Sequence, residues 1–140
     1  MNLHRSILLI EDNPMDVDLT RRALVSGATT NCLDVARDGE EALAYLKRWE
    51  AGDPTPAVVL LEIKLPRLSG LDVLRALKTH PEFRSIPVVV LTTSAEDSDI
   101  QEAYRLGANS CIIKPIEFDK FVKVANQIDV YWCMVNRTPE

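Results

Sequence analysis

The fold of this chain follows from one stretch of its sequence, Ala57-Val58-Val59-Leu60-Leu61-Glu62, in which five apolar residues precede a carboxylate. A short apolar run between prolines is typical of a strand that is buried on both faces of a parallel sheet. In open α/β sheets, ligands bind in the crevice at the carboxyl ends of the strands. The stretch therefore predicts a buried strand and puts Glu62 at a ligand-binding edge.

Four other short runs predict further strands, at residues 6–10, 32–36, 87–91 and 110–113. Three of them are continuously apolar for most of their length, which favours burial on both faces. The run 32–36 alternates apolar and polar residues, as expected of an edge or half-covered strand.

Helices are predicted between and after these strands. The first begins at Asn13-Pro14, a capping residue followed by proline, and ends at Gly27. It carries Asp16 in its first turn, where the helix dipole favours negative charge. The second opens at residues 38–41, the third covers about 71–80, the fourth runs over 97–106 and the last over 117–135.

Five strands alternating with five helices predict right-handed β-α-β units and a parallel sheet covered by helices on both faces. The expected fold class is α/β, with a doubly wound, flavodoxin-like sheet of five parallel strands. At 140 residues the chain is expected to form a single domain, 1–140, with 128–140 as a C-terminal helix extension and tail.

The composition excludes several classes of protein. A formal net charge of -5, with 16 scattered basic residues, argues against a nucleic-acid-binding surface. No apolar stretch is long enough to span a membrane, and the first residues do not resemble a signal peptide. The three cysteines lack metal-binding spacing and are expected to be reduced thiols, so a cytoplasmic protein is predicted.

The chemically distinctive residues follow predicted strands; they are Glu11, Asp12, Glu62, Thr92 and Lys114. Taken singly, each is explained as a polar residue that begins a solvent-exposed loop. Together they are predicted to converge, because the carboxyl ends of parallel strands share one edge. Carboxylates suit Mg²⁺ and can accept a phosphoryl group, while a hydroxyl and an ammonium can bind phosphoryl oxygens. The set therefore indicates phosphoryl transfer to a carboxylate.

Four stretches resemble the receiver domains of response regulators: ILLIEDN at 7–13, LLEIKLPRLSG at 60–70, VLTTS at 90–94 and GANSCIIKP at 107–115. They occur in the usual order and spacing, and the resemblance covers residues 5–127. It implies the strand order 2-1-3-4-5. It also implies a pocket for Mg²⁺, or another divalent cation, formed by Glu11, Asp12, Glu62 and the backbone carbonyl of Lys64.

The same resemblance puts Glu62 at the phosphoacceptor position, where this family has aspartate. It makes Thr92 the switch hydroxyl and Lys114 the pocket lysine, which precedes a cis bond to Pro115. A second departure is Cys111, which stands where an aromatic switch residue is often found. A cysteine cannot repeat the movement of a large ring, so aromatic switching is not expected.

The extra methylene of Glu62 moves its carboxylate by roughly 1.5 Å, one C–C bond. A misplacement of about 1 Å can slow a positioned reaction on the order of a hundredfold, so phosphotransfer is expected to be lost or impaired. Cation binding is expected to be altered as well. Two signalling states stay open: an inactive-like receiver with an altered pocket, or partial mimicry of the phosphorylated state, which carries more charge and more oxygens.

A finer resemblance, at residues 69–94 and 131–139, is to the small receivers paired with cyanobacterial phytochrome histidine kinases. It implies a chemotaxis-type, stand-alone receiver that is not an enzyme, with a sensor histidine kinase, a phytochrome among the candidates, as its partner. The alternative is a small Mg-dependent phosphatase with an acyl-phosphate intermediate. That function would need a second catalytic acid and a cap insertion.

The last predicted helix has two apolar stripes, one including Phe121 and Val122 and the other Val124 and Tyr131. The second stripe either covers more of the core or contacts another chain. The resemblance favours a homodimer through the face of the fourth and fifth helices.

Overall fold

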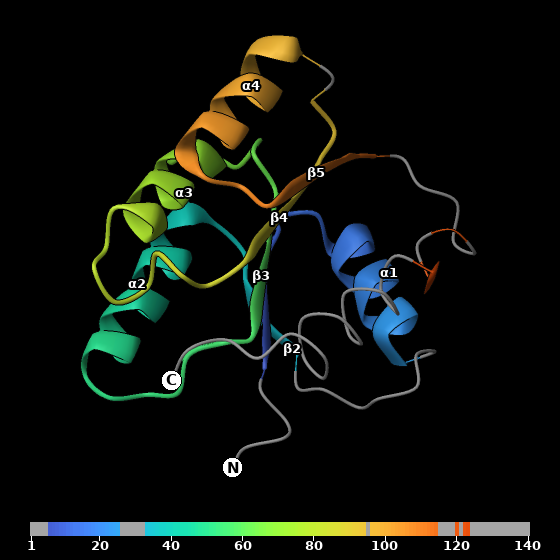
Figure 1. Ribbon diagram of the computed structural model, residues 1–140. Helices are drawn as coiled ribbons and strands as arrows, with labels where there is room; N and C mark the ends of the chain where they lie inside the picture. Colours follow the sequence, from blue (N-terminus) through green and yellow to red (C-terminus); the bar gives the residue numbers. More distant parts are fainter. Residues whose placement is uncertain (1–5, 26–32, 95, 115–119, 121, 124–140) are drawn as a thin grey trace.

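A sheet of five parallel strands separates two layers of helices in the computed structural model of the chain (Figure 1). The structure describes residues 6–25, 33–94, 96–114, 120, 122 and 123. The strands are β1 (Ile7–Ile10), β2 (Leu33–Ala36), β3 (Val58–Leu61), β4 (Val88–Thr92) and β5 (Ser110–Ile113), and their order is β2-β1-β3-β4-β5. The predicted α/β class and strand order are confirmed.

The strand register determines which side chains meet at the carboxyl edge. Ile10 is paired with Ala36 on one side and Leu61 on the other. The next residues continue this pairing, because Glu11 N donates to the Ala36 carbonyl at 2.9 Å and Glu62 N donates to the Ile10 carbonyl at 3.0 Å. Glu11 and Glu62 therefore leave neighbouring strands at the same level.

The four helices whose bounds the structure gives are α1 (Pro14–Val25), α2 (Gly39–Glu50), α3 (Gly70–Lys78) and α4 (Asp97–Leu106). Side chains cap three of them at the N-terminus: Asn13 accepts from Met15 N, Asp38 from Glu41 N and Ser69 from Leu71 N. Gly107 ends α4 in the left-handed conformation. The Gly27 helix end lies outside the described residues. Of the predicted fifth helix, only 120, 122 and 123 are described, and they are helical.

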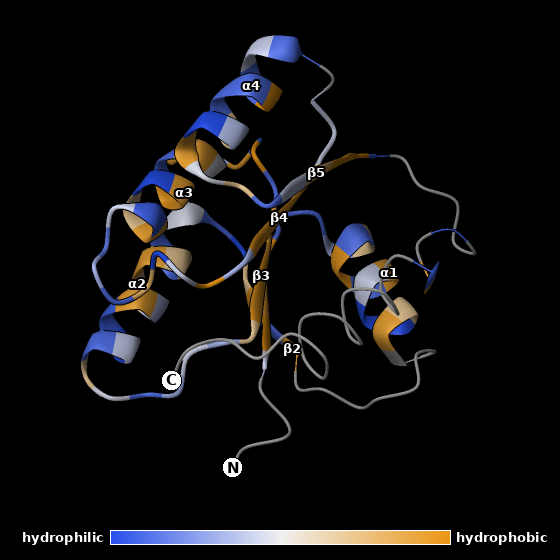
Figure 2. Ribbon diagram, viewed as in Figure 1, coloured by the Kyte–Doolittle hydropathy of each residue, from blue (hydrophilic) through white to orange (hydrophobic). Residues whose placement is uncertain are grey.

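Both faces of the sheet are covered by apolar side chains, with α1 on one face and α2, α3 and α4 on the other (Figures 1 and 2). Leu8, Ile10, Val59 and Leu61 belong to the cluster that includes residues of α2 and α3. Their neighbours along the strands pack with Val17, Ala23 and Leu24 of α1. Burial on two faces explains why these strands are continuously apolar. Among the described helices, none is long and apolar enough to cross a membrane.

The turn between β3 and α3 approaches its own backbone closely at Gly70. Its N–H donates to the Ile63 carbonyl at 2.8 Å. A Cβ at this position would lie 2.1 Å from the Glu62 carbonyl oxygen and 2.8 Å from Ile63 Cα. Glycine is therefore required by space here, and the turn that follows the candidate acceptor has little freedom to shift.

Replacing Gly70 by alanine is expected to lower the free energy of unfolding by about 3 kcal/mol, because the added methyl group overlaps rigid backbone. Gly52→Ala is the matched control, since Gly52 has a φ of +112° but no atom within 4 Å of the added Cβ. Backbone strain alone should cost the control roughly 1–2 kcal/mol. Urea unfolding of both variants measures the difference, and equal losses would contradict the overlap.

Candidate functional site

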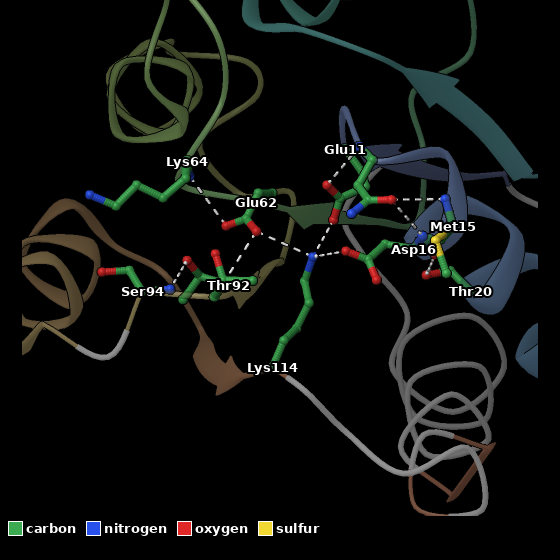
Figure 3. Close-up of polar contacts among 11 residues, drawn as sticks. Glu11, Met15, Asp16, Thr20, Glu62, Lys64, Thr92, Ser94 and Lys114 are labelled. Atoms are coloured by element: carbon green, nitrogen blue, oxygen red, sulfur yellow. Dashed lines mark hydrogen bonds and ion pairs between the residues drawn. The ribbon is translucent and has the colours of Figure 1, made fainter.

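Residues at or just after the ends of β1, β3, β4 and β5 gather at the carboxyl edge of the sheet (Figure 3). Glu11 and Glu62 are each only 3% exposed, and Thr92 is fully buried. The Lys114 side chain, which enters from the end of β5, is 10% exposed. The structure thus brings together four of the five residues that the sequence selected at strand ends.

The Lys114 ammonium lies among three carboxylates (Figure 3). It donates hydrogen bonds to Glu11 Oε1 and, at 2.9 Å, to Asp16 Oδ2. Glu62 Oε1 is 3.2 Å from the same nitrogen. Of the three N–H donors of the ammonium, two are thus bonded to Glu11 and Asp16, and Glu62 is an ion-pair partner.

Asp16 is the site residue that the sequence reasoning missed. An acidic residue in the first turn of a helix is already explained by its favourable interaction with the helix dipole. That explanation gave no reason to expect the second contact of Asp16, with Lys114. The available signal was the short connection, because only residues 11–13 separate the carboxyl end of β1 from α1 at Pro14. A side chain in the first turn of such a helix stays close to the sheet edge.

Three carboxylates surround a single ammonium, so the charges in the site do not balance. Burial makes each unbalanced charge more costly. Burial alone would lower the pKa of Lys114, but its hydrogen bonds to Glu11 and Asp16 and the charges of Glu11 and Glu62 outweigh it and raise that pKa. The pKa of Glu11 is also raised, because burial outweighs the hydrogen bond and charge of Lys114, and the charge of Glu62 adds to the increase. Lys114 is therefore held in its charged form.

Both carboxylate oxygens of Glu62 accept hydrogen bonds from the backbone. Oε1 accepts from Thr93 N at 3.3 Å, and Oε2 accepts from Lys64 N at 3.2 Å. These donors come from the segments that follow β3 and β4. Lys114 Nζ also lies beside Oε1. The Glu62 carboxylate therefore engages both backbone donors and the ammonium at this edge of the sheet.

Thr92 is buried at the site, but its hydroxyl serves the local turn. Its Oγ1 accepts from Ser94 N at 3.0 Å, and Ser94 Oγ donates to Asp99 Oδ2 at 2.7 Å. Lys64 Nζ lies 3.4 Å from the same oxygen of Asp99. Within the described residues, no hydrogen bond joins Thr92 to Glu62.

The predicted metal ligands are only partly assembled. Glu11 and Glu62 are neighbours, whereas Asp12 is exposed on the β1–α1 turn. Over the described residues, no group of three or more His, Cys, Asp or Glu side chains is arranged to hold a metal ion. Carboxylate and carbonyl oxygens are nevertheless the donors that Mg²⁺ prefers, so the residues fit a divalent cation in kind. In this arrangement the buried carboxylates are held by Lys114.

Two other predictions concern the segments around β5. Cys111 is partly buried with a free thiol, and its backbone N–H donates to the Tyr104 hydroxyl at 3.1 Å. The absence of an aromatic switch stays a prediction. The predicted cis bond precedes Pro115, which lies outside the described residues. Cys32 and Cys133 lie outside them as well.

Residues 7–126 match the protein family described as "Response regulator receiver domain". This chain belongs to that family. The resemblance drawn from the sequence motifs is thereby confirmed, and the strand order of this receiver agrees with the order that the resemblance implied.

Several known proteins are similar to this receiver over nearly their whole length. The probable methanogenesis regulatory protein FilR2 of Methanothrix harundinacea is 41% identical, over 95% of this chain and 86% of FilR2. Response regulator Rcp1 of Synechocystis is 33% identical over 94% and 90%. The crystal structure of the Mn²⁺-bound form of Rcp1 has a TM-score of 0.85, with 32% identity over 97% of this chain and 99% of that chain.

A third similar protein is the phosphorylated cyanobacterial phytochrome response regulator RcpA. Its crystal structure has a TM-score of 0.87 and 34% identity, and it covers 98% of this chain and 99% of its own. The expected kinship with phytochrome-associated receivers is therefore confirmed.

The raised pKa of Glu11 predicts how the stability of this receiver depends on pH. Between the ordinary pKa of 4.5 and the raised pKa of the folded state, the unfolded chain has lost the Glu11 proton while the folded chain still holds it. Because the folded state then binds more protons, its stability falls as pH rises through this window. The unfolding free energy of wild type minus that of Glu11→Gln should therefore be largest at or below pH 4.5 and decline above it.

Urea unfolding of both proteins over a series of pH values measures this difference. Thr20→Val is the reference variant, since it alters a buried residue of α1 without removing a titrating group. A difference that grew as pH rose would contradict the raised pKa.

Proposed function

We propose that this chain is a stand-alone receiver of a two-component phosphorelay, bound by a sensor histidine kinase, in which Glu62 makes phosphotransfer lost or impaired. Similarity to RcpA and Rcp1 supports a kinase of the phytochrome kind as the partner. The chain covers 99% of the solved chains of RcpA and Rcp1, which supports a receiver of the same kind. A cytoplasmic location is part of the proposal.

The contacts of Glu62 carry this proposal. A phosphoryl group on a shorter aspartate would need hydrogen-bond donors and a cation for its oxygens. Lys64 N and Thr93 N donate to Glu62, and Lys114 lies 3.2 Å from it. An incoming phosphoryl group would have to displace the carboxylate from these partners, and the nucleophilic oxygen would itself be misplaced.

The contacts of Thr92 support a fixed state over full mimicry of phosphorylation. Glu62 accepts hydrogen bonds from Lys64 N and Thr93 N, whereas the Thr92 hydroxyl accepts from Ser94 N. A single carboxylate has two oxygens and one charge, fewer than an acyl phosphate. We therefore infer that Glu62 replaces some of the phosphoryl contacts without recruiting Thr92.

The proposal includes a divalent cation, Mg²⁺ or one like it, held by Glu11, Asp12, Glu62 and the Lys64 carbonyl. When bound, such an ion supplies positive charge that neutralises phosphoryl and carboxylate oxygens. In the described contacts Glu11 Oε2 accepts a 3.2 Å hydrogen bond from Asn13 N and Oε1 accepts one from Lys114, so a cation at Glu11 would compete with the ammonium.

Regulatory binding, with no catalysis of its own, is the activity proposed for this receiver. A phosphatase acting through an acyl phosphate would need a cap over the edge to enclose its substrate. The described connections after β1, β3 and β4 cover only residues 11–13, 62–69 and 93–96, apart from residue 95. They are too short to form such a cap.

Glu62→Asp is expected to gain phosphorylation that the wild type lacks. The shorter carboxylate would leave Lys64 N and Thr93 N to the phosphoryl oxygens and restore the reach of the nucleophile. Intact-protein mass spectrometry after incubation with acetyl phosphate and Mg²⁺ measures the added phosphoryl group. Glu62→Gln, which keeps the length but removes the nucleophile, is the control. A phosphoryl group on Glu62 of the wild type would refute the proposal.

We also propose a homodimer through the face of α4 and the fifth helix. Two large apolar residues support it from the described part of that face: Tyr104 on α4 is 49% exposed and Ile113 on β5 is 47% exposed. Exposed apolar side chains on such a face favour contact with a second chain.

Ile113→Lys is expected to weaken this dimer by about tenfold or more, because it puts a charge into an apolar contact. Light scattering over a concentration series at micromolar protein measures the effect. Met15→Lys is the matched control, since Met15 is 80% exposed on α1 at the other face of the sheet and should not change the dimer. A monomeric mass for the wild type would end the dimer proposal.

A further inference from the structure

Asp16 is fixed by its backbone so that its side chain can reach the sheet edge. Its N–H lies 3.4 Å from the capping Asn13 Oδ1, and its carbonyl accepts from Thr20 Oγ1 at 2.8 Å. From this position Oδ2 accepts a 2.9 Å hydrogen bond from Lys114 Nζ (Figure 3). Neither helix capping nor the helix dipole requires that contact.

The contact with Asp16 is unlike the other acidic contact of the same helix. Asp18 pairs with Arg22 one turn along α1, and both side chains are more than half exposed. Such a pair contributes little, because water screens both charges. Asp16 instead pairs with a lysine from the far end of the chain whose side chain is 10% exposed.

Binding of a divalent cation at Glu11 conflicts with the present arrangement. Glu11 Oε1 holds the Lys114 ammonium, and a cation and an ammonium repel each other at the same carboxylate. The ammonium must therefore move away from Glu11. A buried ammonium without a carboxylate partner is costly, so it needs another anion within reach.

We propose that Asp16 is a positioning residue of the cation site, which keeps the Lys114 ammonium in the pocket when Glu11 exchanges it for a divalent cation. This proposal rests on the metal-binding part of the proposed function. Asp16 does not bind the cation. It lowers the cost of cation binding by giving the displaced ammonium a carboxylate of its own.

A plain electrostatic effect of Asp16 would make a different prediction. A nearby negative charge attracts a cation whether or not Lys114 is present. A carboxylate that acts by holding the ammonium matters only while the ammonium is there. The effect of Asp16→Asn must therefore be compared with and without the charge of Lys114, as a double-mutant cycle.

The experiment is calorimetric titration of the full chain with Mn²⁺. In the presence of Lys114, Asp16→Asn should weaken Mn²⁺ binding by about tenfold, the scale of one hydrogen bond to a charged group. In the Lys114→Gln background the same substitution should weaken it by about threefold or less. Lys114→Gln alone should bind Mn²⁺ more tightly than the wild type, because the competing ammonium is gone.

Two further variants test the chemistry of the position. Asp16→Glu keeps a carboxylate within reach of Lys114 and should recover most of the affinity. Asp18→Asn removes an equal charge from the exposed side of α1 and should change the affinity by about twofold or less. Urea unfolding checks that each variant is folded. Lys114→Gln keeps a donor for the buried carboxylates, and Lys114→Met is the second version if that variant is unstable.

The outcomes separate the two proposals. If Asp16→Asn weakens Mn²⁺ binding equally in both Lys114 backgrounds, the positioning role is wrong while the cation site stands. If neither the wild type nor Lys114→Gln binds Mn²⁺, the cation site of the proposed function is wrong, and the role of Asp16 falls with it.

Discussion

One ammonium shared by three carboxylates is the interaction on which the rest of this site depends. Lys114 follows β5, Glu11 follows β1, Glu62 follows β3 and Asp16 lies on α1, so the cluster joins the β1–α1 unit to two strands that are distant from it in the sequence. Buried carboxylates without a partner would repel one another and lose hydration. The parallel register brings them together, and Lys114 makes their proximity tolerable.

The sequence predicts most of this fold because its signals are local. Continuous apolar strands, N-caps such as Asn13 and Asp38, and the left-handed glycine at 107 each act within a few residues. The strand order needed the family resemblance, since apolar periodicity is the same in any order of buried strands. Strand ends converge in every parallel sheet, and this convergence is why Glu11, Glu62 and Lys114 could be selected together.

The parts of the site that could not be predicted depend on direction, which strand patterns do not encode. Asp16 had a sufficient local explanation, and only the rotation of α1 relative to the sheet turns it toward Lys114. Thr92 was selected correctly by position, but the turn after β4 decides where its hydroxyl bonds. Asp12 shows the converse, because a strand-end acid next to a buried one is itself exposed. Glu11 and Asp12 are adjacent in the sequence, and only Glu11 is buried.

The hydrogen bonds around Thr92 connect the end of β4 to α4. Glu62 reaches the segment after β4 through Thr93 N, but Thr92 is connected through Ser94 to Asp99 in the first turn of α4. The parallel connection from Lys64 to Asp99 is a single 3.4 Å ion pair from a half-exposed lysine and contributes little. Among the described contacts, the Thr92 hydroxyl accepts from Ser94 N and has no hydrogen bond with Glu62. The Ser94–Asp99 hydrogen bond at 2.7 Å therefore links the end of β4 to α4 without involving the Glu62 carboxylate.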